Sequence, residues 1–153
     1  MDIHIFVEKK VKGRWVPAEA MMKDEGGKLD VPYPQKIYTG RDYELFGFLT
    51  GGQVRTDIGV YAGRLKGFPK DASKQVKKIY GAWGVDGHTP NYITLKELNQ
   101  VDWNRKITDN DGKQIALKDR FDHFFYDVMM RMDFYDIRVH NPAHIRLVFW
   151  FDN

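Results

Sequence analysis

The sequence predicts a single compact α+β domain over residues 1–153, in which a mainly antiparallel sheet holds the N- and C-terminal strands and is packed by three to four helices. Three observations predict this fold. Apolar and polar residues alternate over 3–8, as in a strand with one buried face. The run 145–151 is almost continuously apolar, which is typical of a central strand covered on both faces. Several segments between them have apolar residues at helical spacing.

The N-terminal segment predicts a β-hairpin. Gly13 favours a turn between the alternating residues and a return strand at 14–16, which Pro17 ends. Residues 18–37 are weakly patterned, and two glycines and two prolines within them oppose regular structure. We therefore expect a long surface connection there.

The first helix is expected to begin near Thr39, which with Asp42 resembles a capping box, and to end at Gly51. Five glycines lie within 50–70, so we expect mostly loop there, with one short strand near 58–62.

A second helix is expected after Asp71, taken as its N-cap, because apolar residues follow at helical spacing up to Gly84. We expect a loop over 84–93. The spacing of Thr94 and Glu97 is that of a full capping box, so it predicts a third, short helix.

A hairpin is expected over 105–117, turning at Asp111 and Gly112. The strongest helical pattern of the chain then covers 118–134, where six apolar residues share one face. We expect a short extended run at 137–140 before Pro142.

Composition narrows the class of protein. The 24 Lys and Arg residues exceed the 21 Asp and Glu residues by only three, so nucleic acid is a possible partner but not a favoured one. The absence of Cys excludes disulfides and thiolate chemistry. No apolar run has the length of a membrane span, and the first residues lack the pattern of a signal peptide. We expect a cytoplasmic protein without a membrane partner.

One loop carries residues that suit catalysis. His88 can act as a general base near neutral pH, and Asp86 is a carboxylate that could orient its ring. A structural role for the same pair stays open, since Asp-Gly is also common turn chemistry. The motifs of serine hydrolases, P-loop proteins and dinucleotide-binding folds are absent. We expect no metal site and no cofactor.

Basic and aromatic residues interleave over 38–68, a composition that suits a nucleotide-like ligand. If loops 50–70 and 84–93 line a single cavity, the candidate ligand contacts are Tyr38, Arg41, Arg55, Trp83 and His88. The alternative is that the arginines pair with nearby carboxylates and the aromatic residues belong to the core.

Several segments occur together in a fixed order: 38–46, 67–73, 83–88, 94–98 and 146–153. In this they resemble a family of small proteins from bacteriophages and bacterial genomes that has no assigned function. The resemblance implies a host-directed binding role, because small phage proteins without catalytic motifs often block a defence complex or sequester a nucleotide signal.

Three functions follow as hypotheses. The leading one is a phage or prophage protein in the cytoplasm of a bacterial host, which blocks a host protein or sequesters a nucleotide-type signal, with counter-defence as one such role. The protein-blocking version predicts an exposed apolar patch. The first alternative is a small metal-independent phosphodiesterase or nucleotide hydrolase that uses His88 and Asp86. The second alternative is a structural or housekeeping protein of the phage particle.

Overall fold

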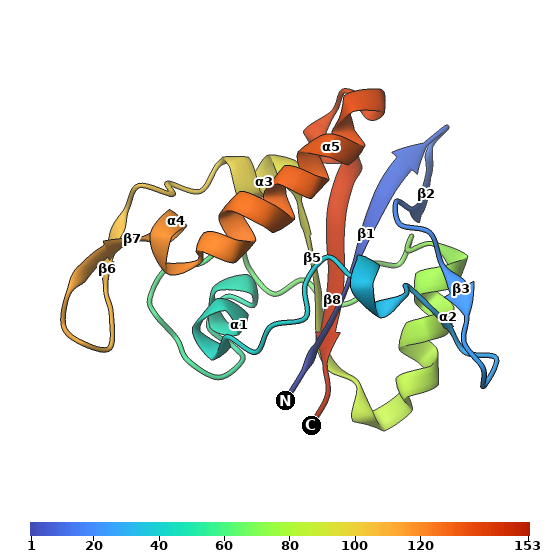
Figure 1. Cartoon of the computed structure of the whole chain (residues 1–153), viewed down its shortest axis with the longest axis horizontal. Coiled ribbons are helices and arrows are strands. Elements are labelled where there is room, and N and C mark those ends of the chain that lie inside the picture. Colours follow the sequence, from blue (N-terminus) through green and yellow to red (C-terminus); the bar gives the residue numbers. More distant parts are fainter.

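The structure is a computed structural model that describes residues 1–153. It is built around a four-stranded antiparallel sheet of order β2-β1-β8-β5 (Figure 1). The strands are β1 (Ile3–Val11), β2 (Arg14–Pro17), β8 (Ile145–Phe151) and β5 (His88–Thr94). β1 and β8 are central neighbours, with Ile3 opposite Phe151. The predicted α+β fold, with both terminal strands in one sheet, is confirmed.

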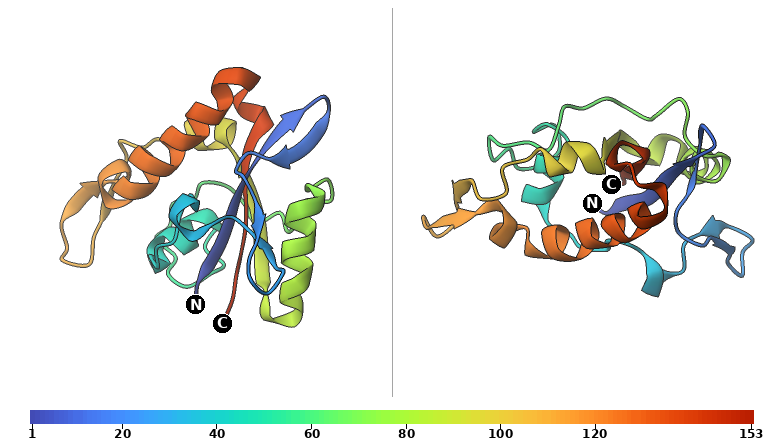
Figure 2. Two further views of the ribbon diagram at one scale, coloured as in Figure 1. Left: turned by 45° about the vertical axis from the view of Figure 1, so that its right-hand side comes forward. Right: turned by 90° about the horizontal axis from the view of Figure 1, so that it is seen from above.

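Helices cover both faces of this sheet (Figures 1 and 2). The larger core lies between one face and α1 (Tyr43–Leu49), α3 (Leu95–Asn99), α4 (Leu117–Arg120) and α5 (Met129–Val139). A smaller core lies on the other face under α2 (Lys74–Trp83). All seven residues of β8 are buried, which explains its continuous apolar sequence. None of the helices combines the length and the apolar character that crossing a membrane requires.

Shorter elements connect these layers. Two small hairpins, β3 (Met22–Lys23) with β4 (Leu29–Asp30) and β6 (Lys106–Thr108) with β7 (Gln114–Ala116), lie outside the main sheet. The second of them is the predicted hairpin. Three 3₁₀ turns are η1 (Tyr33–Gln35), η2 (Gly84–Asp86) and η4 (Pro142–His144), and a π-helical turn η3 (Phe124–Val128) precedes α5.

The structure corrects three element boundaries. The fourth helix is not one segment over 118–134: it is interrupted after Arg120 and continues through the π-helical turn to Val139, so five α-helices are present and 137–140 is not extended. α2 is capped by Ser73, not Asp71, because the Ser73 hydroxyl accepts the Val76 N–H. The Asp71 carboxylate instead accepts from Arg146.

Four further local expectations differ from the structure. No strand forms near 58–62. Loop 84–93 contains β5, the edge strand beside β8. The connection 18–37 contains the β3–β4 hairpin and η1. At α1 the cap is Asp42 itself, which accepts the Leu45 N–H, and Thr39 takes no part. The capping box of Thr94 and Glu97 forms as predicted.

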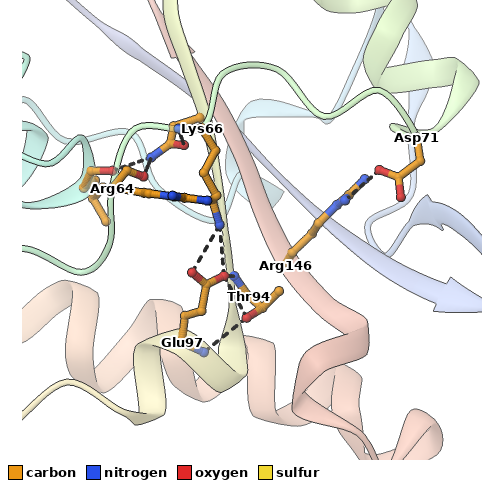
Figure 3. A network of polar contacts seen from close by, with 8 residues as sticks. Arg64, Lys66, Asp71, Thr94, Glu97 and Arg146 are labelled. Atoms are coloured by element: carbon orange, nitrogen blue, oxygen red, sulfur yellow. Dashed lines mark hydrogen bonds and ion pairs between the residues drawn. The ribbon is translucent and has the colours of Figure 1, made fainter.

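A buried ion pair lies on the α2 side of the sheet. Arg146 and Glu8 are 3% and 0% exposed, and the Arg146 Nε donates to Glu8 Oε1 at 2.9 Å. A second guanidinium nitrogen reaches Asp71 at 3.0 Å, as Figure 3 shows. The Trp15 ring covers the guanidinium with 3.8 Å between their centres. This network joins β1, β8 and the residues that lead into α2.

Candidate functional site

The return strand β2 pairs with only the second half of β1. Their register runs from Val11 opposite Arg14 to Glu8 opposite Pro17. Beyond it, the Val7 carbonyl accepts the Ala18 N–H, and the Val7 N–H donates to the Glu19 carboxylate at 3.1 Å. The chain then turns away from the sheet. The first half of β1 therefore has no neighbouring strand on this side.

In this half of β1, some main-chain N–H and C=O groups point to the side that has no neighbouring strand. In an antiparallel ladder, successive residues direct their N–H and C=O alternately to the two sides. The Asp2 carbonyl bonds to the main chain of Asp152, the residue after β8, and Val7 bonds on the opposite side. By this alternation Ile3 and Ile5 point away from β8, and no loop or side chain of the protein bonds to their main chain. Two donors and two acceptors are left unpaired.

A cavity of about 500 Å³ lies along this edge. We call it the β1 cavity. One wall is the open edge of β1, and the other is the segment from Tyr33 to Arg41 that leads from η1 to α1. Its lining residues are Asp2, Ile3, His4, Ile5, Phe6, Tyr33, Lys36, Tyr38, Thr39, Gly40 and Arg41. Two of the residues proposed as ligand contacts, Tyr38 and Arg41, are among them.

Ion pairs fix the charged groups of the cavity. Arg41 Nε donates to Asp2 at 2.7 Å, and Lys36 Nζ donates to Asp30 at 3.0 Å. The hydrogen bond from Arg41, with its positive charge, lowers the pKa of the Asp2 carboxyl. Each base is thus neutralised by one carboxylate, but only the Nε of Arg41 is engaged, so its two terminal guanidinium nitrogens can still donate hydrogen bonds to an acidic group of a ligand.

His4 connects the cavity to the other face of the sheet. Its Nε2 lies 2.9 Å from the Asp152 carboxylate. Burial alone would raise the pKa of Asp152, but hydrogen bonds from His4 and the Asp2 N–H lower it below its ordinary value. The ring packs against Trp83 of α2 in a tilted arrangement, with 4.3 Å between centroids and 38° between the ring planes. Trp83, predicted as a ligand contact, therefore supports a residue of the cavity from behind.

Tyr38 forms part of the cavity wall and is 7% exposed. Burial, reinforced by the negative charge of Asp42, raises the pKa of its phenol to about 12, so it stays protonated at neutral pH. A Cβ atom at Gly40 would overlap the Tyr38 hydroxyl. Glycine at position 40 therefore allows the phenol of Tyr38 to lie against the main chain of residue 40.

The remaining predicted contacts lie elsewhere. Arg55 is exposed and stacks on Tyr43 of α1 with 4.5 Å to the ring centroid. Asp86 and Trp83 line a different cavity of about 460 Å³ between α2 and the β3–β4 hairpin. None of the four best-formed cavities is lined by both stretches that were expected to meet, 50–70 and 84–93.

Those two stretches do touch, but at Asn91. Its side chain is buried, accepts the Lys66 N–H and donates to the carbonyls of Leu49 and Arg64. Lys66 continues to the carboxylate of Glu97 at 3.1 Å, as Figure 3 shows. All of these groups are satisfied by one another, so this contact holds a loop against β5 and leaves no room for a ligand.

His88 and Asp86 do not form a pair. The His88 Nδ1 lies 3.0 Å from the Thr89 hydroxyl, and no hydrogen bond or ion pair links the ring to Asp86, which is exposed. The Nε2 atom is buried and has no partner. A general base must lie within hydrogen-bond reach of the substrate proton that it takes. Here one ring nitrogen is engaged by Thr89, the other is buried, and no carboxylate is linked to the ring, so the expected His–Asp pair is absent.

The open main chain of Ile3 and Ile5 and the side chain of Lys36 were missed as site components. A signal was present, because the nine residues of β1 exceed the four residues that Pro17 leaves for β2. No three His, Asp or Glu side chains lie where they could hold a metal ion together.

Comparison of the chain with protein-family models, curated proteins and solved structures gave no match in any of the three. The resemblance to the phage and bacterial family stays a prediction, and the function must be argued from the geometry.

Proposed function

We propose that the protein is a phage- or prophage-type host-interaction protein that binds, and thereby blocks, a host protein. In this proposal the β1 cavity takes an extended segment of the partner, which adds to the sheet as a further strand in line with β2. Strand addition is a common mode of peptide recognition, in which main-chain hydrogen bonds supply affinity and side-chain contacts supply specificity.

The observation that carries the proposal is the unpaired main chain of Ile3 and Ile5 inside a walled cavity. At about 3.3 Å per residue, this edge has room to pair with three or four residues of a partner. The sheet side chains and Tyr38 offer apolar contacts, and the terminal guanidinium nitrogens of Arg41 suit an acidic side chain. We therefore expect a segment of alternating apolar residues with an acidic residue at one end.

The other readings have less support. Of the five proposed nucleotide contacts, only Tyr38 and Arg41 line the β1 cavity. Trp83 lines a different cavity, and Arg55 and His88 line neither of the two. The hydrolase hypothesis requires His88 to be linked to a carboxylate, and the structure has no such pair. The protein-blocking reading is favoured because a partner strand needs only an accessible main-chain edge.

The test uses a displayed library of random peptides selected on the purified protein. Replacing Arg41 with Glu should weaken the selected acidic peptides about tenfold, a change of about 1.4 kcal/mol in binding free energy. The matched control is Arg55→Glu, since Arg55 is also an exposed arginine and lies outside the cavity. Its variant should bind with unchanged affinity. Equal losses in both variants would indicate a nonspecific charge effect and contradict the proposal.

Methylation of the peptide main chain provides a second arm. A peptide that adds as a strand donates hydrogen bonds to β1 from alternate residues only. N-methylation should therefore abolish binding at every second residue and be tolerated between them. Tolerance at every position would show recognition by side chains alone and exclude strand addition.

A further inference from the structure

A stripe of exposed apolar side chains runs along the outer surface of α5 and of the π-helical turn η3 before it, which holds Tyr126. Tyr126, Met130, Phe134 and Ile137 are 46%, 64%, 67% and 61% exposed. They follow one another at intervals of four, four and three residues, which is the spacing of one helical face. We call this set the α5 stripe. Figures 1 and 2 show α5 on the outside of the molecule, with no element over it.

The opposite face of the same helix explains why the stripe is unusual. Val128, Met129 and Met132 are buried in the main core, so the helix is already held by an apolar face. A second apolar face is not needed for folding and exposes large side chains to water at a cost. Contiguous exposed apolar patches mark interaction surfaces. The protein-blocking hypothesis predicted such a patch, but the sequence pattern itself favours a particular occupant.

The positions of the stripe residues are nearly symmetric about Met132. Met130 and Phe134 lie two residues on either side of Met132, and Tyr126 and Ile137 lie six residues before it and five after it. The mismatch is one residue, or about 1.5 Å along a helix. An antiparallel second copy would therefore place Met130 against Phe134 and Tyr126 against Ile137. This is the self-complementarity that a two-fold interface requires.

Two opposite charges on one flank of the stripe have the same symmetry. Asp127 and Arg138 are eleven residues apart, about three helical turns, so they flank the stripe on one side. They lie five residues before and six residues after Met132. In an antiparallel pair each Asp127 faces the Arg138 of the other copy. Arg138 takes part in no ion pair within its own chain, and the one ion-pair partner of Asp127 is the exposed His123, at 2.6 Å.

We propose that the α5 stripe is the interface of a two-fold symmetric homodimer, in which two α5 helices pack antiparallel. A pair of single helices buries less than the roughly 800 Å² per partner of a standard interface. The dimer is therefore weak, with a dissociation constant on the order of micromolar or above. Each dimer carries two β1 cavities, because no residue of the stripe lines that cavity.

Sedimentation equilibrium over a range of protein concentrations tests the dimer. The native chain should reach the mass of a dimer, and Phe134→Asp should stay a monomer at every concentration. The matched control is Val85→Asp, since Val85 is 96% exposed and lies outside α5. It should dimerise as the native chain does. A native chain that is monomeric throughout would overturn the proposal.

A charge exchange tests the antiparallel arrangement. Asp127→Arg alone should weaken dimerisation at least tenfold, because it faces Arg138 with a like charge. The double variant Asp127→Arg/Arg138→Asp should restore it. Because Asp127 also contacts His123, the melting temperature of each variant is measured to exclude unfolding. Failure of the double variant to recover, with its fold intact, would overturn the antiparallel pairing.

Cross-linking gives an independent result, because the chain contains no cysteine. A mixture of Met130→Cys and Phe134→Cys chains should form the mixed disulfide faster than either symmetric one. Preference for symmetric disulfides would contradict the antiparallel register. Peptide binding by the Phe134→Asp monomer distinguishes the two proposals, since the β1 cavity should bind peptides with or without the dimer.

Discussion

At the scale of residues, a few buried polar side chains replace missing secondary-structure partners. The Glu19 carboxylate accepts the N–H of Val7 where β2 ends, so it closes the ladder at the boundary of the open edge. The Arg146 guanidinium joins strands to α2 through Glu8 and Asp71. Sequence patterns do not reveal such pairs, because they connect residues far apart in the chain.

The buried pair of Glu8 and Arg146 predicts a large cost for removing one partner. Glu8→Ala should lower the free energy of unfolding by about 3 kcal/mol, because it leaves a buried guanidinium without its main counter-charge. The double variant Glu8→Met/Arg146→Met should cost much less, since no charge remains buried. Urea denaturation measures both. A double variant less stable than Glu8→Ala would show that the pair itself stabilises the fold.

Glu19 predicts a pH dependence of stability. Burial raises its pKa above the ordinary 4.5, although the Val7 N–H and the charge of Arg131 oppose this shift. The folded state therefore keeps the proton at a pH where the unfolded state has lost it. Stability falls as pH rises from about 4.5 through the raised pKa, and the penalty is fully present above that.

Glu19→Gln keeps an acceptor for the Val7 N–H and removes the charge. The stability of the native chain relative to Glu19→Gln should therefore decline as pH rises from the pKa of Glu19 in the unfolded state to its raised pKa in the folded state. Urea denaturation at several pH values would show this decline. The direction in which the relative stability changes with pH tests the prediction. A relative stability that increases over this range would mean that the folded state favours the carboxylate.

At the scale of elements, the sequence predicted those whose signals are local. The capping box of Thr94 and the helical spacing of α2 lie within one turn or face, so α3 and α2 were expected close to where they form. β5 was missed because its residues are polar and do not alternate, and a bulge lies between His88 and Asn91. Its partner β8, far away in the chain, makes it a strand.

The site was predicted only in part, for the same reason. Tyr38 and Arg41 line the β1 cavity, and both belong to the basic and aromatic stretch that suggested a ligand. Arg55 from the same stretch turns to Tyr43 instead. The unpaired groups of Ile3 and Ile5 are main-chain atoms, and composition cannot indicate which main-chain groups lack a partner.

Two glycines in helices predict opposite effects of the same substitution. A Cβ atom at Gly47 of α1 would lie 1.9 Å from the Thr56 carbonyl oxygen, whereas one at Gly81 of α2 meets nothing within 4 Å. Gly47→Ala should destabilise the protein by about 3 kcal/mol, because main chain must move. Gly81→Ala should stabilise it by about 0.5–1 kcal/mol. Thermal denaturation of the two variants checks the difference, and equal effects would contradict the packing of loop 50–70 on α1.

At the scale of the whole molecule, the two proposed surfaces lie on either side of one segment. The residues from Tyr33 to Thr39 line the β1 cavity, and they also line a second cavity of about 460 Å³ that includes Met130 of the α5 stripe. The sheet fixes the first surface and the core-facing side of α5 fixes the second. A dimer through α5 would therefore present two β1 edges on one particle, and a bivalent partner would bind more tightly than a single segment.

Amide hydrogen exchange in the free protein, resolved by NMR, tests the open edge most directly. His4 and Phe6 bond to β8, so their amides should exchange slowly, whereas the amides of Ile3 and Ile5 on the same strand should exchange many times faster. Addition of a selected peptide should slow exchange at Ile3 and Ile5 alone. Equal protection of all four amides in the free protein would mean that β1 has no open edge, and strand addition would be excluded.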